Sequence, residues 1–260
     1  MIPIRDANPT RRLSIVTLAL IATNVAVFLL WEPTFGGSGE QTEFFYCHAE
    51  IPFEVVHQES LAQGGIEARQ AIDQDLGPGA GEQVQAALQQ ACPNKGWLAS
   101  VFIAMFLHGG WLHIAGNMLF LWIFGDNVED RLGHAVFLLF YVIGGLVASG
   151  LQLAFDANST IPSLGASGAI GAVLGAYAVL FPRARVTTLV LFFFITVVEI
   201  RAWFVLAAWF LLKLFSGVGQ LGAELNGGVA YWAHIGGFAF GAVVAWLFHR
   251  PRRSTIYGST

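Results

Sequence analysis

Residues 161–181, IPSLGASGAIGAVLGAYAVLF, form a largely apolar stretch long enough to cross a bilayer, and a serine lies inside it. A membrane-spanning helix needs about 20 mostly apolar residues to cross about 30 Å of hydrocarbon. Polar groups inside such a span are costly, so Ser167 in Gly165-Ala166-Ser167-Gly168 is a candidate functional residue. The same reasoning applies to His234 in Ala233-His234-Ile235-Gly236-Gly237.

The composition of the whole chain indicates the same environment. Of its 260 residues, 55% are hydrophobic and 12% are charged, whereas soluble domains have roughly 45–50% apolar and about 25% charged residues. The formal net charge is −4 and no cluster of Lys and Arg occurs, which argues against a nucleic-acid partner. We therefore expect a multi-pass protein of the lipid bilayer.

Six apolar segments predict an all-α membrane protein with six membrane-spanning helices. They are residues 14–31, 111–125, 135–155, 161–181, 200–215 and 229–248. Residues 186–198 are expected to form an apolar entry segment at the membrane interface. No small-residue cleavage site follows the first segment, so we expect it to be a retained span rather than a signal peptide.

The basic residues predict the orientation, because cytoplasmic loops carry an excess of Lys and Arg. With the N-terminus inside, the outer segments hold only Arg69 and Lys95. The inner segments hold Arg5, Arg11, Arg12, Arg131, Arg183, Arg185, Arg250, Arg252 and Arg253. Both termini are therefore predicted to be cytoplasmic, with residues 32–110 outside.

The outer loop, residues 32–110, contains both cysteines, Cys47 and Cys92. In an oxidising compartment two such cysteines can pair, and two free thiols are the alternative. Between them, residues 53–75 and 82–91 are predicted to form short amphipathic helices that are separated by a Gly-Pro-Gly break. Residues 97–107 are apolar and are expected to lie partly embedded at the outer surface.

Ser167 and His234 are expected at the same depth, within about 10 Å of the outer interface at about 1.5 Å per helical residue. Small residues accompany both. They are Ser163, Gly171 and Gly175 around Ser167, and Ala230, Gly237 and Gly241 around His234. Such strips let helices approach closely, as a Ser–His hydrogen bond of about 3.2 Å requires. Ordinary helix packing would explain these small residues, but it would not explain why Ser167 and His234 lie at the same depth.

A third set of polar residues lies at the start of the second span. His113 and Asn117 are four residues apart, so they share one helix face and could donate hydrogen bonds toward one point. A tetrahedral oxyanion needs such donors. The alternative is that Asn117 bonds across helices and His113 reaches the surface. His108 flanks this set and is expected to bond water or substrate.

These segments resemble the rhomboid family of intramembrane serine proteases. The matching pieces are His113-x-x-x-Asn117, Glu129-Asp130-Arg131-Leu132-Gly133, Gly165-Ala166-Ser167-Gly168 and Ala233-His234-x-Gly236-Gly237. The resemblance implies a six-helix bundle in which Ser167 is the nucleophile and His234 the general base, with no obligatory Asp. It also implies an oxyanion hole formed by His113, Asn117 and the amide of Ser167, with His108, Gly165 and Gly168 lining the site.

Two features depart from the family pattern. Many members have a Tyr four residues after the serine that stacks on the catalytic histidine, and this chain has Gly171 there. Another group must then hold the imidazole, and Tyr231 and Trp232 are the candidates. A Trp-Arg pair found in the first loop of some members is absent, so the 32–110 loop either takes its role or adds a surface module.

The sequence thus predicts an intramembrane serine endopeptidase that cleaves transmembrane proteins near the outer face, with no metal or cofactor. A metal-dependent protease would need His-Glu-x-x-His, which is absent. The expected parts are residues 1–31 (N-terminus and first span), 32–110 (outer loop with an insert between the cysteines), 111–249 (catalytic core) and 250–260 (cytoplasmic tail). The expected location is a bacterial inner membrane, with the site on the extracytoplasmic side. The alternative is a catalytically silent rhomboid-like protein that binds transmembrane clients.

Overall fold

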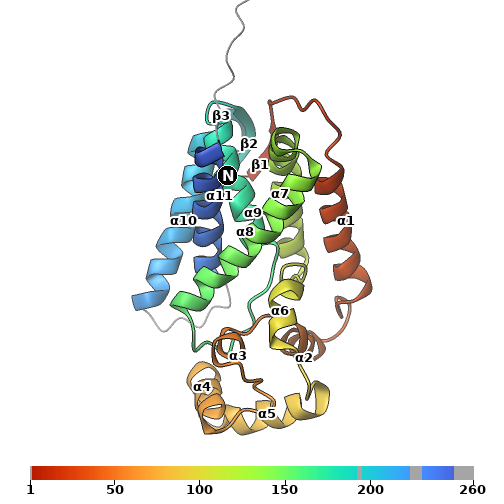
Figure 1. Ribbon diagram of the computed structural model, residues 1–260, viewed down its shortest axis with the longest axis vertical. Helices are drawn as coiled ribbons and strands as arrows, with labels where there is room; N and C mark the ends of the chain where they lie inside the picture. Colours follow the sequence, from red (N-terminus) through yellow and green to blue (C-terminus); the bar gives the residue numbers. More distant parts are fainter. Residues whose placement is uncertain (1, 192–194, 223–229, 249–260) are drawn as a thin grey trace, which may run out of the picture.

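The structure is a computed structural model that describes residues 2–191, 195–222 and 230–248, so the expected tail at 250–260 lies outside the described residues. Its main part is a bundle of long helices. They are α1 (Ile15–Leu30), α7 (Trp111–Leu132), α8 (His134–Phe155), α9 (Ser167–Leu180), α10 (Ala202–Gly222) and α11 (Tyr231–Phe248). In Figure 1 the bundle runs between a small sheet at one end and the short helices α2–α5 at the other.

The helix bounds agree closely with the predicted spans for α1, α8 and α11 and differ for α7 and α9. Helix α7 continues to Leu132 because the charged residues after position 125 stay helical, and it ends at Gly133, whose φ of 82° favours glycine. Helix α9 begins only at Ser167, so Ser163 lies before the helix and not on it. Among the described residues, α8 and α11 are long and apolar enough to cross a membrane, whereas α1, α9 and Ala202–Phe215 are shorter apolar helices.

A three-stranded antiparallel sheet closes one end of the bundle. Its strands are β1 (Ile2–Asp6), β2 (Arg185–Leu191) and β3 (Ile195–Arg201), in the order β1-β2-β3. Val186 pairs with Asp6 on one side and Ile200 on the other. The chain is mostly helical, but the prediction of an all-α protein is wrong for this end, because the described residues of the expected interfacial segment at 186–198 lie in β2 and β3. Their β-branched side chains favour strands.

Helix α9 is the centre of the bundle, and it packs most extensively against α11 and α8. Its residues from Gly168 to Tyr177 are all buried. Small residues let α9 and α11 approach closely. A Cβ atom added at Gly237 or Gly241 would collide with a backbone oxygen of α9, that of Gly168 or Ala172. The predicted close packing of these two helices is therefore confirmed.

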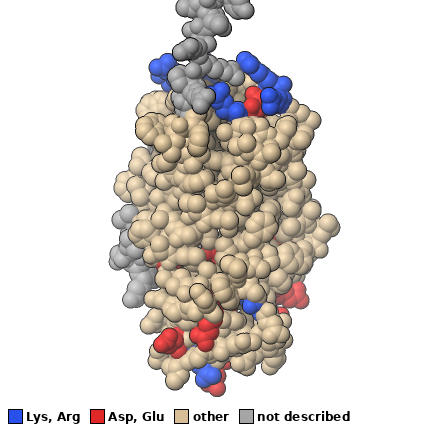
Figure 2. Space-filling view, in the orientation of Figure 1, with Lys and Arg blue, Asp and Glu red and all other residues tan. Residues whose placement is uncertain are grey.

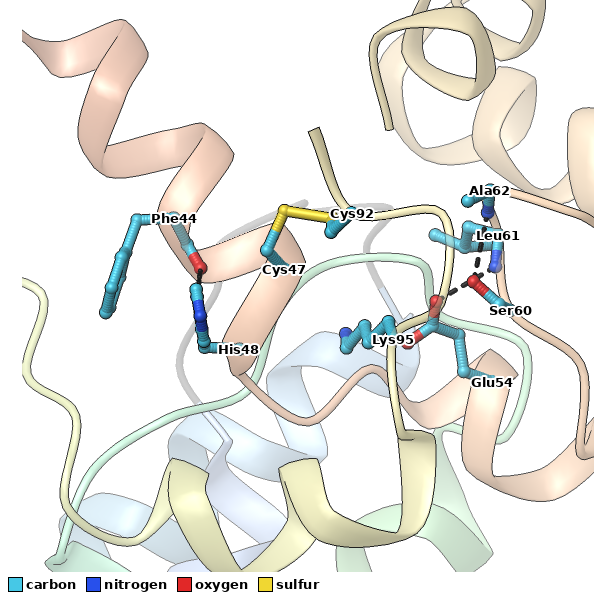
Figure 3. Close-up of a disulfide and its surroundings, with 9 residues drawn as sticks. All are labelled: Phe44, Cys47, His48, Glu54, Ser60, Leu61, Ala62, Cys92 and Lys95. Carbon is cyan, nitrogen blue, oxygen red and sulfur yellow. Dashed lines mark hydrogen bonds and ion pairs between the residues drawn. A yellow bond between two sulfur atoms is a disulfide. The ribbon is translucent and has the colours of Figure 1, made fainter. Parts of the chain in front are cut away.

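Residues 32–110, expected to form the outer loop, are called the insert below and fold around a core of their own. The insert contains α2 (Ser38–His48), α3 (Pro52–His57), α4 (Ile66–Leu76), α5 (Ala80–Ala91) and α6 (Trp97–Ala104). The side chains of this second core are Tyr46, Ile51, Phe53, Leu61, Ala62, Ala68, Ala71, Ile72 and Leu88. Cys47 and Cys92 form a disulfide with an S–S distance of 2.04 Å, which ties α2 to the end of α5 (Figure 3).

The insert holds the segment that leads into Ser167. The amide of Ser163 donates to the Glu50 carbonyl (2.7 Å), and the amide of Phe53 donates to the Ser159 carbonyl (3.0 Å). The amide of Thr160 donates to the Asp75 carboxylate at 2.6 Å. These contacts connect positions far apart in the chain, so the insert fixes the start of α9.

A buried ion pair stiffens the insert close to these anchors. Lys95 Nζ lies 2.6 Å from Glu54 Oε2, and both side chains are almost fully buried (Figure 3). Beside this pair, the hydroxyl of Ser149 on α8 donates a hydrogen bond to Glu50 Oε1 at 2.7 Å. The insert therefore contacts α8 as well as the segment before α9.

Candidate active site

Ser167 and His234 meet where α9 and α11 begin. Ser167 is the first residue of α9, and His234 lies in the first turn of α11. Ser167 Oγ and His234 Nε2 are 2.7 Å apart, which is hydrogen-bond distance. His234 is only 5% exposed, and its Nδ1 has no hydrogen-bond partner in the described part of the chain. The geometry is that of a serine–histidine pair in which no carboxylate of the described residues contacts the imidazole.

The turn before Ser167 gives the serine this position. Gly165 has a φ of 127°, a backbone conformation that favours glycine, and its amide donates to the Ala104 carbonyl at 2.8 Å. The first amides of an α-helix have no partner within the helix. Because α9 starts at Ser167, amides at this end are available to a negatively charged oxygen.

His113 and Asn117 of α7 supply two more donors. The amide of Gly109 donates to His113 Nδ1 at 3.2 Å, which leaves the ring proton on Nε2. A Cβ atom at Gly165 would lie 2.8 Å from His113 Nε2 and 3.5 Å from Ser167 Oγ, so the missing side chain leaves open space beside both. Asn117 Nδ2 is buried and has no partner within the described residues.

These residues share one cavity of about 460 Å³, a size typical of ligand sites. Its lining comes from the insert, α7, the segment before α9, α9 itself, α10 and the start of α11. The lining residues are Phe45, Gly109, Leu112, His113, Gly116, Asn117, Phe120, Leu164, Ser167, Ile170, Leu174, Trp209, Lys213, Ala230 and His234. The structure thus brings four of the predicted site residues, Ser167, His234, His113 and Asn117, to one place.

The aromatic neighbour of the imidazole comes from α10. Trp209 meets the His234 ring edge to face, with 5.8 Å between ring centroids. The two residues considered from the sequence lie elsewhere, because Trp232 stacks on Phe155 at 4.1 Å and the Tyr231 ring faces Lys213. Gly171 has no room for an aromatic side chain, since even a Cβ atom there would lie 3.0 Å from the His234 carbonyl oxygen.

Two other predicted site residues, His108 and Gly168, lie next to this cavity but do not line it. His108 is buried, lies outside the cavity lining, and meets the His113 ring at 5.1 Å between centroids. Its amide donates to Glu32 Oε1 at 3.0 Å, and burial raises the pKa of Glu32 to about 7. Gly168 packs against Ala148 of α8 and lets α8 approach α9.

Among the lining residues that sequence reasoning missed, Phe45, Trp209 and Lys213 are aromatic or charged. Phe45 and Trp209 are aromatic residues in apolar or mixed helices, and nothing local distinguishes them from packing residues. Lys213 did carry a signal, because it is a charged residue inside an apolar stretch of α10.

The structure thus contains a buried serine–histidine pair inside a bundle of apolar helices, and the comparisons with known proteins identify the family. The model of the rhomboid domain matches residues 95–251, more than half of the chain, beginning within the insert. The chain belongs to the rhomboid family.

Named relatives come from mitochondria and from a bacterium. "Rhomboid protein 1, mitochondrial" of Saccharomyces cerevisiae is 31% identical over 159 residues, covering 58% of this chain and 42% of the relative. "RHOMBOID-like protein 12, mitochondrial" of Arabidopsis thaliana is 30% identical over 176 residues, covering 62% and 49%. "Rhomboid protease GluP" of Bacillus subtilis is 46% identical over 70 residues, covering 27% and 13%. The match thus spans less than half the length of these relatives.

Proposed function

We propose that this chain is an intramembrane serine endopeptidase with Ser167 as nucleophile and His234 as general base. The observation that carries the proposal is the 2.7 Å contact between Ser167 Oγ and His234 Nε2 inside the cavity. His234 Nε2 accepts the hydroxyl proton while Oγ attacks the scissile carbonyl carbon. The protonated imidazole then donates to the leaving amine, and water hydrolyses the acyl-enzyme. The Bacillus subtilis relative is named a protease, which agrees with this reaction.

The negative charge of the tetrahedral intermediate would be stabilised by His113 Nε2, Asn117 Nδ2 and the amide of Ser167. Asn117 Nδ2 has no partner in the described structure, so an oxyanion would supply the acceptor that this buried donor lacks. Removing one such donor typically costs about 10²–10³ in kcat.

We infer six spans, formed by α1, α7, α8, α9, α10 and α11, with the sheet end in the cytoplasm. Figure 2 shows Lys and Arg gathered at the sheet end and acidic residues mainly at the insert end, with an almost uncharged band between them. The excess of basic charge favours the cytoplasmic side for the sheet end. Large apolar side chains are exposed along the helices, for example Leu139 and Leu146 of α8 and Val243 and Trp246 of α11. Lipid contact would cover this surface.

The length of α9 supports a site below the outer surface of the membrane. Its 14 residues cover about 21 Å at 1.5 Å each, less than the roughly 30 Å of hydrocarbon. The irregular segment before Ser167 would then lie at membrane depth. Such backbone is tolerated where protein surrounds it or a cavity opens onto it, and the insert and the 460 Å³ cavity provide both.

We propose the same division as from the sequence: residues 1–31, the 32–110 insert, the 111–249 core and the 250–260 tail. The family match begins at position 95, so it also covers α6 of the insert. Substrates would be transmembrane proteins. The disulfide favours an oxidising compartment on the insert side, and the mitochondrial relatives weaken the expectation of a bacterial inner membrane.

The test is labelling of the purified full chain with a fluorophosphonate probe in detergent. We expect label on the wild type and none on Ser167→Ala or His234→Ala. Ser163→Ala is the matched control, because it removes the nearest other serine in the turn and should label like the wild type. Absence of label from a folded wild type would refute the enzyme and favour the alternative of a client-binding protein.

A further inference from the structure

Lys213 places a cation in the wall of the cavity that contains Ser167 and His234. It lies on α10 among Leu211, Leu212, Leu214 and Phe215, and it is half-buried. A lysine at the centre of a span costs about 2.5–3.5 kcal/mol on insertion scales, and such residues usually mark a functional position. Among the described lining residues, Lys213 alone has a Lys, Arg, Asp or Glu side chain.

Lys213 lines the cavity and has no ion-pair partner among the described residues. Its Nζ lies 5.8 Å from the centroid of the Tyr231 ring, at the outer limit of a cation–π contact. The ion pairs found within the described ranges join Lys95 to Glu54, His134 to Glu129 and Arg185 to Glu199, and none includes Lys213. Nζ is therefore a hydrogen-bond donor without a carboxylate partner in the described structure.

The position of Lys213 relative to the dyad follows from its spacing on α10. Trp209, which contacts the His234 ring, lies four residues earlier, so the two side chains share one helix face. Helix α10 starts beside the sheet and runs toward the insert end (Figure 1), which puts Lys213 one turn closer to the insert end than Trp209. A substrate bound with its scissile carbonyl at Ser167 would pass this cation.

We propose that Lys213 is a specificity-determining residue that binds an Asp or Glu side chain of the substrate close to the scissile bond. This inference rests on the proposed function. In a cavity wall that is mostly apolar, an acidic substrate side chain would supply the missing acceptor, and a charge-assisted hydrogen bond of this kind corresponds to about a tenfold gain or more. A basic substrate side chain at the same place would be repelled.

The test compares single-span substrates that differ at one position, with Asp, Asn or Lys placed in turn at each of the four residues on either side of the cut. For the wild type we expect kcat/KM to be about tenfold higher for Asp than for Asn at one position. Lys213→Met should bring this ratio to about one, and Lys213→Glu should favour the Lys substrate at that position. Leu211→Met, an exposed neighbour outside the cavity lining, is the matched control and should keep the wild-type ratio.

Fluorophosphonate labelling of each variant separates this inference from the proposed function. If the wild type is labelled but cleaves Asp and Asn substrates equally at every position, the role of Lys213 is refuted and the enzyme stands. If Lys213→Met lowers cleavage of all substrates by the same factor, and only in vesicles of anionic lipid, Nζ binds a lipid phosphate and the inference is also refuted.

Discussion

Replacing Gly237 by Ala tests whether the dyad depends on the close contact of α9 and α11. The added Cβ would stand more than 1 Å inside the ordinary contact distance of 3.4 Å from the Gly168 oxygen, and 3.2 Å from the Ala172 amide nitrogen. Both partners are backbone atoms, so the helices must separate by about 1 Å to restore contact distance. The 2.7 Å bond between Ser167 and His234 would then lengthen beyond hydrogen-bond range.

A misplacement of about 1 Å can cost about 10²-fold in rate, which corresponds to about 2.7 kcal/mol of activation free energy. Alanine is a better helix former than glycine, so a loss of activity would not come from a weaker α11. Two further substitutions complete a graded series. Gly171→Ala brings its Cβ to 3.0 Å from the His234 oxygen and should have a smaller effect, and Gly150→Ala on α8 meets nothing within 4 Å and should have none.

The assay is kcat/KM for a single-span reporter in proteoliposomes, together with the rate of fluorophosphonate labelling and the melting temperature of each variant. We expect activity to fall in the order Gly150→Ala, Gly171→Ala, Gly237→Ala while the melting temperature stays high enough for the proteins to be folded at the assay temperature. A folded Gly237→Ala protein with kcat/KM within threefold of the wild type would refute the dependence of the dyad on this contact.

Two further predictions concern the insert. Reducing the Cys47–Cys92 disulfide removes a cross-link between cysteines separated by 45 positions, which stabilises the fold by about 4 kcal/mol in the chain-entropy model. Amide hydrogen exchange should then become faster in α4 and α5 and stay the same in α8. An unchanged exchange pattern in α4 and α5 would contradict this prediction. Burial raises the pKa of Glu50 to about 7 from 4.5, and Glu54 and Lys95 are the charged groups beside it. Because the fold favours the protonated form, the contribution of Glu50 to stability should be greatest below about pH 4.5, fall by about 3 kcal/mol up to about pH 7 and then level off. The melting temperature of the wild type should thus be higher at pH 5 than at pH 8, and this difference should be smaller in Glu50→Gln. If Glu50→Gln shows the same difference as the wild type, the role of Glu50 is refuted. Glu32→Gln measures the part of the difference that comes from Glu32, whose pKa is also raised.

The contact between Ser167 and His234 could be anticipated because polar residues in apolar spans are few, and because both residues lie a few positions inside the same end of their spans once the arginines set the orientation. The irregular segment before α9 was harder to predict. Pro162 and Gly165 interrupt helices, but the apolar composition around them suggested a continuous span. Residues 186–198 show the same ambiguity, since apolar β-branched runs suit both a span and a strand.

The contacts of the insert could not be predicted from local patterns. The hydroxyl of Ser149 and the carboxylate of Glu50 are 99 positions apart, and Thr160 and Asp75 are 85 apart. No periodicity or turn signal links such residues, because their pairing depends on how α8 and α9 pack. The same limit applies to Trp209, whose contact with His234 depends on the placement of α10.

The insert precedes α8 and α9 in the chain, and this order has a consequence for biogenesis. Its core and its disulfide join residues from Tyr46 to Cys92 only, so the insert can fold before the ribosome has made the segment that carries Ser167. Glu50, Phe53 and Asp75 would then offer a finished docking surface to residues 159–163 as these emerge. Ser167 would reach its place late in synthesis, guided by a part of the protein that is already complete.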